Sequence, residues 1–295
     1  MSLADVFVAD RSLGEAAFVE TLPEAVVAAA GLVTRLGDPL TLLVIVAAGY
    51  LLANRLGVGV PRMATALALA IGAFALTLAL KHAFSLPRPP GAGVDGYGFP
   101  SGHAIGATVV YGGLLSVLPS DRRSPAAVAA AGTLVVLVAA SRVVIGVHYL
   151  VDVAVGVAVG LAYLAAALRI GPGLVPDRVT VADARRVFAV ALVAGLAGVA
   201  VAVVRDTVVA VAAAGGGLVG WHLAADRIVA ARGSLRGLAL SVLTLLVVVV
   251  SVEAVLETGL SLAAAAVLTV CVVALLVGTP GLADRLVEKE LDVGR

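Results

Sequence analysis

The sequence predicts an all-α membrane protein, a polytopic bundle of helices, and three observations support this fold class. Hydrophobic residues make up 61% of the 295 residues, and mean hydropathy is +1.13. Charged residues make up only 13%, whereas a soluble domain carries about a quarter. Long apolar runs recur from residue 39 to residue 278. A chain this apolar is also not intrinsically disordered.

Nine apolar runs mark the candidate transmembrane helices. They fall at about 39–53, 63–80, 104–118, 126–141, 152–168, 187–204, 207–225, 237–252 and 259–278. Several are shorter than the roughly 20 residues that cross a bilayer core, but helix tilt and local thinning can absorb the difference. Residues 24–36 form a further short helix that either lies at the interface or is half inserted. We therefore expect about nine or ten transmembrane helices.

A break at residues 169–186 divides the chain into two predicted parts. It contains the sequence GPG and a further proline, which end helices. Thr180 and Asp183 have the spacing of a capping box that opens the next helix. Residues 1–170 form a predicted core, and residues 171–295 add a four-helix module with a short tail.

The distribution of lysine and arginine predicts the orientation, because cytoplasmic loops carry an excess of positive charge. When loops alternate between the two sides, one set holds fourteen basic residues and the other holds five. The richer set consists of Arg55, Arg62, Arg122, Arg123, Arg169, Arg178, Arg185, Arg186, Arg227, Arg232, Arg236, Arg285, Lys289 and Arg295. The poorer set consists of Arg35, Lys81, Arg88, Arg142 and Arg205. We expect a multi-pass cell-membrane protein with loops 81–103 and 142–150 outside and a cytoplasmic C-terminus.

Other simple features exclude several classes of function. The net charge of +1 provides no basic field that would recruit nucleic acid. Cys271 is the single cysteine, so an intrachain disulfide cannot form. The residues before the first long apolar run include five charged ones, which is not the pattern of a secretory signal peptide: Asp5, Asp10, Arg11, Glu15 and Glu20.

Three segments place ionisable residues at the ends of apolar runs, all on the predicted outer face. Residues 81–90 read KHAFSLPRPP, residues 100–103 read PSGH, and residues 141–152 read SRVVIGVHYLVD. Ionisable groups close to hydrocarbon are costly, so a cluster of them is by default a functional-site hypothesis.

These segments could bind a phosphoryl group. Lys81, Arg88 and Arg142 provide three positive charges, and guanidinium groups match phosphate oxygens two at a time. Ser101 and Gly102 precede a predicted helix, whose first backbone N–H groups attract an anion. Because glycine has no side chain, Gly102 also lets the backbone approach a ligand closely.

The same segments hold candidates for catalysis. His148 and Asp152 are four residues apart and therefore lie on one helix face. The carboxylate can keep one imidazole nitrogen protonated and leave the other free to attack phosphorus. His103 comes from a different helix, so it could protonate the departing oxygen at the opposite end of an in-line displacement.

Each of these residues also has an interpretation without catalysis. The three cations could extend to the membrane surface as interfacial side chains, and His148 could be a satisfied histidine at a helix end. His103, His148 and Asp152 could bind a metal ion, although three nearby cations disfavour it. The complete set in this spacing favours phosphoryl chemistry.

The three segments resemble the signature of the type 2 phosphatidic acid phosphatase family: K-x6-R-P, P-S-G-H and S-R-x5-H-x3-D, complete and in order. The resemblance covers residues from about 30 to 170. The wider superfamily includes bacterial acid phosphatases and vanadium-dependent haloperoxidases. The resemblance implies a phosphatase core of about six membrane helices, an extracytoplasmic site, and neither metal ion nor other cofactor. The helices after residue 180 lie outside the family pattern.

By position, the resemblance also implies a role for each signature residue. His148 would become phosphorylated, Asp152 would be its partner, and His103 would be the general acid. The phosphoryl oxygens would be bound by Lys81, Arg88, Ser101, Gly102 and Arg142.

We therefore expect an integral membrane phosphatase that hydrolyses a lipid phosphate monoester or a polyprenyl diphosphate. A charged site at the bilayer surface suits an amphiphile whose head reaches water while its tail stays in lipid. One alternative is a lipid phosphotransferase, in which an alcohol replaces water. Another is a non-catalytic protein that binds or transports lipid phosphates, against which the His148–Asp152 pair argues, because binding alone needs no nucleophile.

A cysteine in the loop 81–103 tests the orientation. Asp95→Cys, in a chain whose Cys271 is replaced by serine, should react with a membrane-impermeant maleimide on intact cells. Arg178→Cys, in a predicted inner loop, is the matched control and should react only after lysis. The opposite pattern of labelling would invert the orientation.

Overall fold

A computed structural model of the chain describes residues 11–230, 235–257 and 259–293, and all regular structure in these ranges is helical. The α-helices are α2 (Glu15–Val19), α3 (Glu24–Val33), α4 (Pro39–Leu51), α5 (Val60–Phe84), α6 (Gly102–Val117), α7 (Pro125–Val144), α8 (Leu150–Ile170), α9 (Val181–Val201), α10 (Arg205–Ala230), α11 (Leu235–Glu257) and α12 (Leu262–Val293). Two short 3₁₀ helices, η1 (Thr34–Gly37) and η2 (Ser120–Arg122), precede α4 and α7. The expected all-α class is confirmed.

Six of the described helices are long and apolar enough to cross a membrane. They are α5, α7, α8, α9, α10 and α12. The segment Glu24–Gly37 and α4 pass the same test together but are bent by 46° where they meet, so a seventh span results if they count as one. Two shorter apolar helices cover Gly102–Val117 and Leu238–Ser251. The total of nine or ten crossings therefore stays a prediction.

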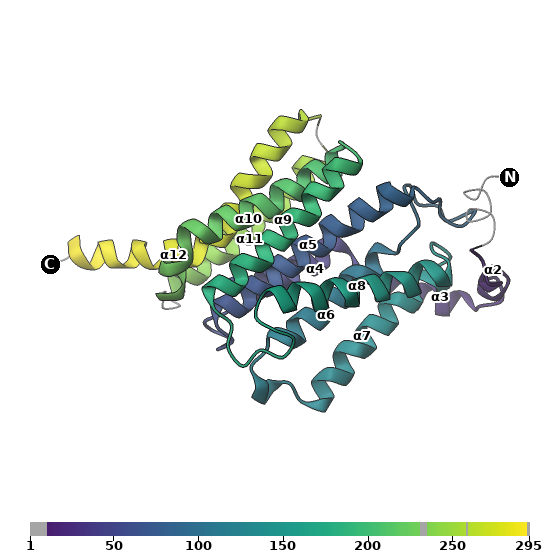
Figure 1. The fold of residues 1–295 in the computed structure, drawn as a ribbon, viewed down its shortest axis with the longest axis horizontal. Coiled ribbons are helices and arrows are strands. Elements are labelled where there is room, and N and C mark those ends of the chain that lie inside the picture. The colour runs from purple at the N-terminus through teal and green to yellow at the C-terminus, as the bar shows by residue number, and fades with distance from the viewer. Residues whose placement is uncertain (1–10, 231–234, 258, 294–295) are drawn as a thin grey trace.

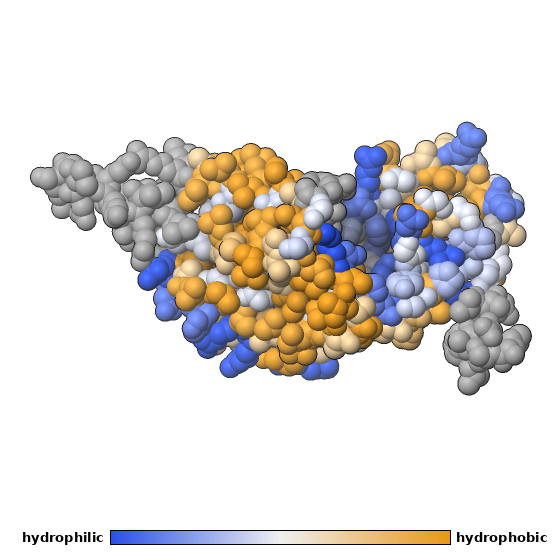
Figure 2. Space-filling view, turned by 90° about the horizontal axis from the view of Figure 1, so that it is seen from above, coloured by the Kyte–Doolittle hydropathy of each residue, from blue (hydrophilic) through white to orange (hydrophobic). Residues whose placement is uncertain are grey.

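Helix α5 forms the centre of the bundle. Within its most apolar window 72% of the residues are buried, against 22% in α7. Figure 1 shows α4 and α5 between two groups of helices, with α9 to α12 on one side and α6 to α8 on the other. In Figure 2 hydrophobic residues form a broad band across the middle of the molecule, and hydrophilic residues gather towards both ends. This distribution suits a protein whose middle lies in lipid.

The helices after the predicted break pack directly on the preceding ones. Helix α9 runs along α5, and α10 contacts α5, α9 and α12. One cluster of buried apolar side chains extends from Leu42 to Val277, and the Tyr50 hydroxyl donates to the Val277 carbonyl at 2.6 Å. The predicted division at residue 170 is thus a break between helices that share one core. That it separates two domains stays a prediction.

Side chains cap the starts of two helices, and the capping box expected from Thr180 and Asp183 is confirmed. The Ser124 hydroxyl accepts from the Ala127 backbone at the start of α7, where proline occupies the first turn. At the start of α9, Thr180 and Asp183 form a capping box. These bonds satisfy backbone N–H groups that have no partner within the helix.

Alternate loops meet at opposite ends of the bundle. At one end, arginines bind backbone carbonyls of neighbouring loops: Arg62 donates to Val117 at 2.8 Å, and Arg122 donates to Leu56 at 2.8 Å. Arg123 reaches the break after α8 in the same way. The other end collects the C-termini of α5 and α7 and the N-termini of α6 and α8, so the three signature segments converge there.

Gly156 lets α8 approach the start of α6. A Cβ atom at this position would lie 2.8 Å from the Ser101 carbonyl oxygen, which belongs to the backbone and cannot rotate away. We expect Gly156→Ala to lower the free energy of unfolding by about 1–3 kcal/mol, as overpacking does. Gly132→Ala in α7, where a Cβ would meet nothing within 4 Å, is the control. Thermal unfolding in detergent measures both, and equal stability of the two variants would contradict this packing role.

Candidate functional site

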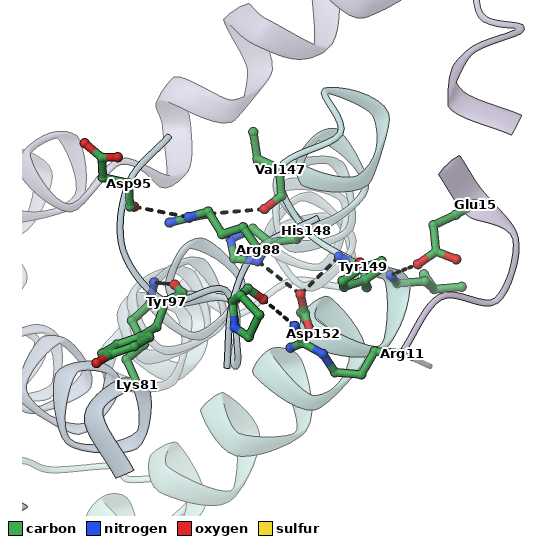
Figure 3. A network of polar contacts seen from close by, with 12 residues as sticks. Arg11, Glu15, Lys81, Arg88, Asp95, Tyr97, Val147, His148, Tyr149 and Asp152 are labelled. Atoms are coloured by element: carbon green, nitrogen blue, oxygen red, sulfur yellow. Dashed lines mark hydrogen bonds and ion pairs between the residues drawn. The ribbon is translucent and has the colours of Figure 1, made fainter. Parts of the chain in front are cut away.

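Four helix ends carry the residues that the sequence singles out. Lys81 lies in the last turns of α5, and Arg142 lies in the last turn of α7. Ser101 is the N-cap of α6, directly before Gly102 and His103. The remaining three are in the loop before α6 and around the start of α8: Arg88, His148 and Asp152. Figure 3 shows Lys81, Arg88, His148 and Asp152 in one network of polar contacts.

His148 is almost completely buried, with 2% of its surface exposed. Its Nε2 lies 3.2 Å from Nη1 of Arg88. Because a guanidinium can only donate, Nε2 is the acceptor, and the proton of a neutral ring is then on Nδ1. Nδ1 faces Oδ2 of Asp152 at 3.5 Å, longer than a normal hydrogen bond. Catalytic hydrogen bonds are often this long before substrate binds.

The carboxylate of Asp152 is fully buried and anchored by the backbone. Oδ2 accepts from the Tyr149 backbone N–H at 3.0 Å, which caps the start of α8. The backbone carbonyl of Asp152 accepts from the Ser101 N–H at 3.0 Å and so ties the start of α8 to the start of α6. The carboxylate therefore has one oxygen that serves both the helix cap and the imidazole of His148.

The three cations are held by neutral acceptors. Lys81 Nζ donates to the Tyr97 carbonyl at 2.7 Å. Arg88 donates through Nε to the carbonyl of Asp95 and through Nη1 to that of Val147, each at 3.2 Å. Arg142 Nη1 donates to Oγ1 of Thr34 at 2.7 Å.

None of these three cations forms an ion pair with a carboxylate in the described parts of the chain. Positive charge is therefore concentrated around His148 without a matching acid on each group, and this favours an anionic ligand. Two buried donors in the same segments, Ser101 Oγ and Arg142 Nε, also lack a hydrogen-bond partner within the described residues. A buried donor without a partner costs free energy that a bound ligand can recover.

Gly102 also allows close helix packing, a role that the sequence alone does not indicate. A Cβ at this position would lie 2.8 Å from Cγ2 of Thr77 and 3.7 Å from Cε of Lys81. The absence of a side chain thus lets the start of α6 pack against α5 beside the lysine. Close approach of a ligand to this backbone stays a prediction.

His103 is paired with an acid that the sequence analysis did not select. Its Nε2 lies 2.7 Å from Oδ1 of Asp38, the residue before α4. A carboxylate in this position orients the imidazole and stabilises its protonated form. The sequence does contain a signal, because Asp38 follows Arg35 in a loop that the charge distribution places on the outer face.

Two further residues complete the surroundings and were not predicted as site residues. Thr34 accepts from Arg142, and Arg11 forms a 2.9 Å ion pair with Asp152. Both come from the chain before α4, where the apolar pattern is too weak to predict which residues face the site. The sequence does not indicate which side chains these residues contact.

Burial and charge determine the protonation of the two groups in contact. Burial lowers the pKa of His148 to about 4, and the cations Arg88, Arg142 and Lys81 act in the same direction against the opposing effect of Asp152. Burial also lowers the pKa of Arg88 from its usual value, but arginine stays charged. At neutral pH the pair is therefore a neutral imidazole beside a guanidinium.

The fold and the site together define a helical, apolar protein that gathers histidines and unneutralised cations at one end of its bundle. Residues 61–175 match the family model of the PAP2 superfamily, which supports the assignment of this part of the chain to the type 2 phosphatidic acid phosphatase superfamily. The match includes all three signature segments. No curated protein and no solved structure matches the chain. Members of the superfamily are phosphatases, which supports a phosphoric ester hydrolase in general.

The Asp38–His103 pair predicts a dependence on the leaving group. Asp38→Asn should lower kcat for an alkyl phosphate about tenfold or more, because general acid catalysis contributes roughly 10²–10⁴. The loss should be smaller for 4-nitrophenyl phosphate, whose leaving group needs no proton. Asp95→Asn is the control, since only the backbone of Asp95 contacts the site. Equal losses with both esters would indicate that Asp38 has a structural role alone.

Proposed function

We propose that the protein is an integral membrane phosphatase that hydrolyses a lipid phosphate monoester or a polyprenyl diphosphate on the extracytoplasmic side. One observation carries this proposal: a buried, neutral His148 is surrounded by Lys81, Arg88 and Arg142, none of which is neutralised by a carboxylate contact in the described chain. Such a site attracts a phosphoryl dianion and presents a nucleophile to it.

In the first step Nε2 of His148 would attack phosphorus. The N–P bond forms as the P–O bond to the leaving group breaks, and His103 delivers a proton to the departing oxygen. The Nδ1 proton stays directed at Asp152, which stabilises the positive charge that develops on the ring. Lys81, Arg88 and Arg142 stabilise the charge on the phosphoryl oxygens, usually the largest contribution to such a reaction.

In the second step water would release phosphate from the phosphohistidine. His103, now without its proton, accepts one from the water as the oxygen attacks phosphorus. The N–P bond breaks, and Nε2 regains its lone pair. Asp38 can support both steps, because its carboxylate stabilises the ring when it is protonated and orients it when it is neutral.

The position of the site at the ends of apolar helices supports a lipid substrate. Phe84, at the end of α5, is 50% exposed, and its ring packs edge-on against Phe99 with centroids 5.0 Å apart. Apolar side chains next to a cationic site suit a ligand with a charged head and a hydrocarbon tail. A soluble phosphate ester would gain little from them.

The site chemistry supports a mechanism without a metal ion. Among the described residues no group of three histidine, cysteine or acidic side chains is arranged to hold a metal ion. The nitrogen of His148 that could coordinate a metal instead faces a guanidinium, and that of His103 faces Asp38. Three cations supply the positive charge that a metal would otherwise provide.

Replacement of His148 tests the proposal. His148→Ala should reduce phosphate release from the preferred lipid by at least a thousandfold, as loss of a nucleophile does. His222→Ala, an exposed histidine far along the chain in α10, should have wild-type activity. The assay uses purified protein in detergent with EDTA present and a panel of phosphatidate, phosphatidylglycerophosphate and polyprenyl diphosphate.

Two results would change the proposal. Unaltered activity of His148→Ala would remove the phosphohistidine step, and loss of wild-type activity in EDTA would favour a metal site. The same assay with an added alcohol separates hydrolysis from transfer, because a phosphotransferase forms a new phosphate ester at the expense of free phosphate.

A further inference from the structure

The segment that precedes the first long helix crosses the site. Arg11 and Glu15 contact residues of the first and third signature segments, although they are more than 65 residues away from both in sequence. Figure 3 shows the Arg11 side chain reaching Asp152 from this segment, and Glu15 reaching the start of α8. We name residues 11–15 the N-terminal strap.

Arg11 contacts the first and third signature segments and the residue just before the second. Nη1 forms an ion pair with Oδ1 of Asp152 at 2.9 Å, and Nη2 donates to the carbonyl of Pro87. The guanidinium lies 5.8 Å from the ring centre of Phe99 and 5.1 Å from that of Tyr149, within the range of cation–π attraction. One side chain therefore links the loop before α6, at Pro87 and Phe99, to the start of α8.

The ion pair between Arg11 and Asp152 is buried. Its two side chains are 7% and 0% exposed. A buried charge pair of this kind is strongly coupled to its surroundings, because the loss of either partner leaves an uncompensated charge away from water. An interfacial arginine that only extended to the membrane surface would not be buried in this way.

Glu15 fastens the strap at its other end. Its Oε1 accepts from the Leu150 backbone N–H at 3.0 Å, and its Oε2 accepts from the Leu13 N–H at 2.6 Å. The first bond satisfies a free donor in the first turn of α8. The strap is thus attached at two places to the helix that carries Asp152.

We infer that Arg11 is a positioning residue of the phosphate site: it holds the Asp152 carboxylate by Oδ1, which keeps Oδ2 directed at Nδ1 of His148, and it balances the negative charge of that carboxylate. This role rests on the proposed function only for its effect on turnover. The two oxygens of the Asp152 carboxylate have different partners. Oδ1 contacts Arg11, and Oδ2 faces Tyr149 and His148.

The charges around His148 predict the direction in which the loss of Arg11 would change the pKa of its imidazole. Lys81, Arg88 and Arg142 disfavour a proton on the imidazole, and Asp152 favours one. The second imidazole, His103, is close enough to interact electrostatically with the first. With Arg11 present, the guanidinium balances much of the negative charge of the carboxylate that faces the neutral imidazole. Without Arg11 its full negative charge would act on His148, so the imidazole would bind a proton more readily and lose its free lone pair.

The first measurement does not depend on catalysis. The pKa of His148 is followed by NMR of protein labelled with ¹⁵N-histidine, and His148→Ala identifies its signals. Arg11→Ala should raise this pKa by about one unit or more, because a nearby positive charge is lost. Arg11→Lys should retain most of the wild-type value. Arg35→Ala, an exposed arginine on the same predicted face, is the matched control and should leave it unchanged.

The second measurement uses the preferred lipid substrate. Arg11→Ala should lower kcat about a hundredfold with little change in KM, and millimolar guanidinium should restore part of the activity. In an Asp152→Ala background the same substitution should have almost no further effect, because Arg11 acts through that carboxylate. Glu15→Gln loosens the strap without touching the ion pair and serves if Arg11→Ala does not fold.

The outcomes separate this inference from the proposed function. If the wild type has no activity on any lipid phosphate, the proposed function fails while the NMR comparison still decides the role of Arg11. An unchanged His148 pKa in folded Arg11→Ala, or an additive loss in the Asp152→Ala background, would overturn the inference. A shifted pKa that Arg11→Lys restores supports it.

Discussion

The structure depends on the meeting of a neutral imidazole with positive charges that lack acidic partners at one end of an apolar bundle. Lys81, Arg88 and Arg142 are fixed by backbone carbonyls and by a hydroxyl, which hold a cation in place without cancelling its charge. Carboxylates contact the two histidines instead. This arrangement keeps positive charge that attracts anions beside an unprotonated imidazole nitrogen, and the fold brings those groups together.

The fold achieves this by alternating direction. Helices α5 and α7 run towards the site and α6 and α8 run away from it, so four helix ends meet although their residues are far apart in sequence. Gly156 and Gly102 allow α8 and α5 to approach the start of α6. At the opposite end arginines donate to backbone carbonyls of neighbouring segments. Arginine therefore joins loops at one end of the bundle and supplies positive charge to the candidate site at the other.

Much of this was predictable from the sequence, for a physical reason. The apolar composition and the helix breaks are local properties, and the structure bears out the helices that they predict. The expectation that His148 and Asp152 lie on one helix face is wrong, because His148 precedes Tyr149, the N-cap of α8, although its Nδ1 still faces Oδ2 of Asp152 at 3.5 Å. The partners Asp38 and Arg11 were not predictable, because a contact across 65 or 141 residues depends on packing and not on spacing. The number of membrane crossings was uncertain for a related reason: hydrocarbon and protein interiors select equally apolar side chains, so short runs such as 102–117 carry no signal that distinguishes them.

The contact between Arg88 and Nε2 of His148 has a consequence for reactivity. The lone pair that would attack phosphorus in the proposed mechanism accepts a hydrogen bond from the guanidinium. In the proposed mechanism a phosphoryl group would offer Arg88 stronger acceptors, so the guanidinium would leave the nitrogen as the substrate binds. Until then the hydrogen bond would protect the proposed nucleophile from other electrophiles.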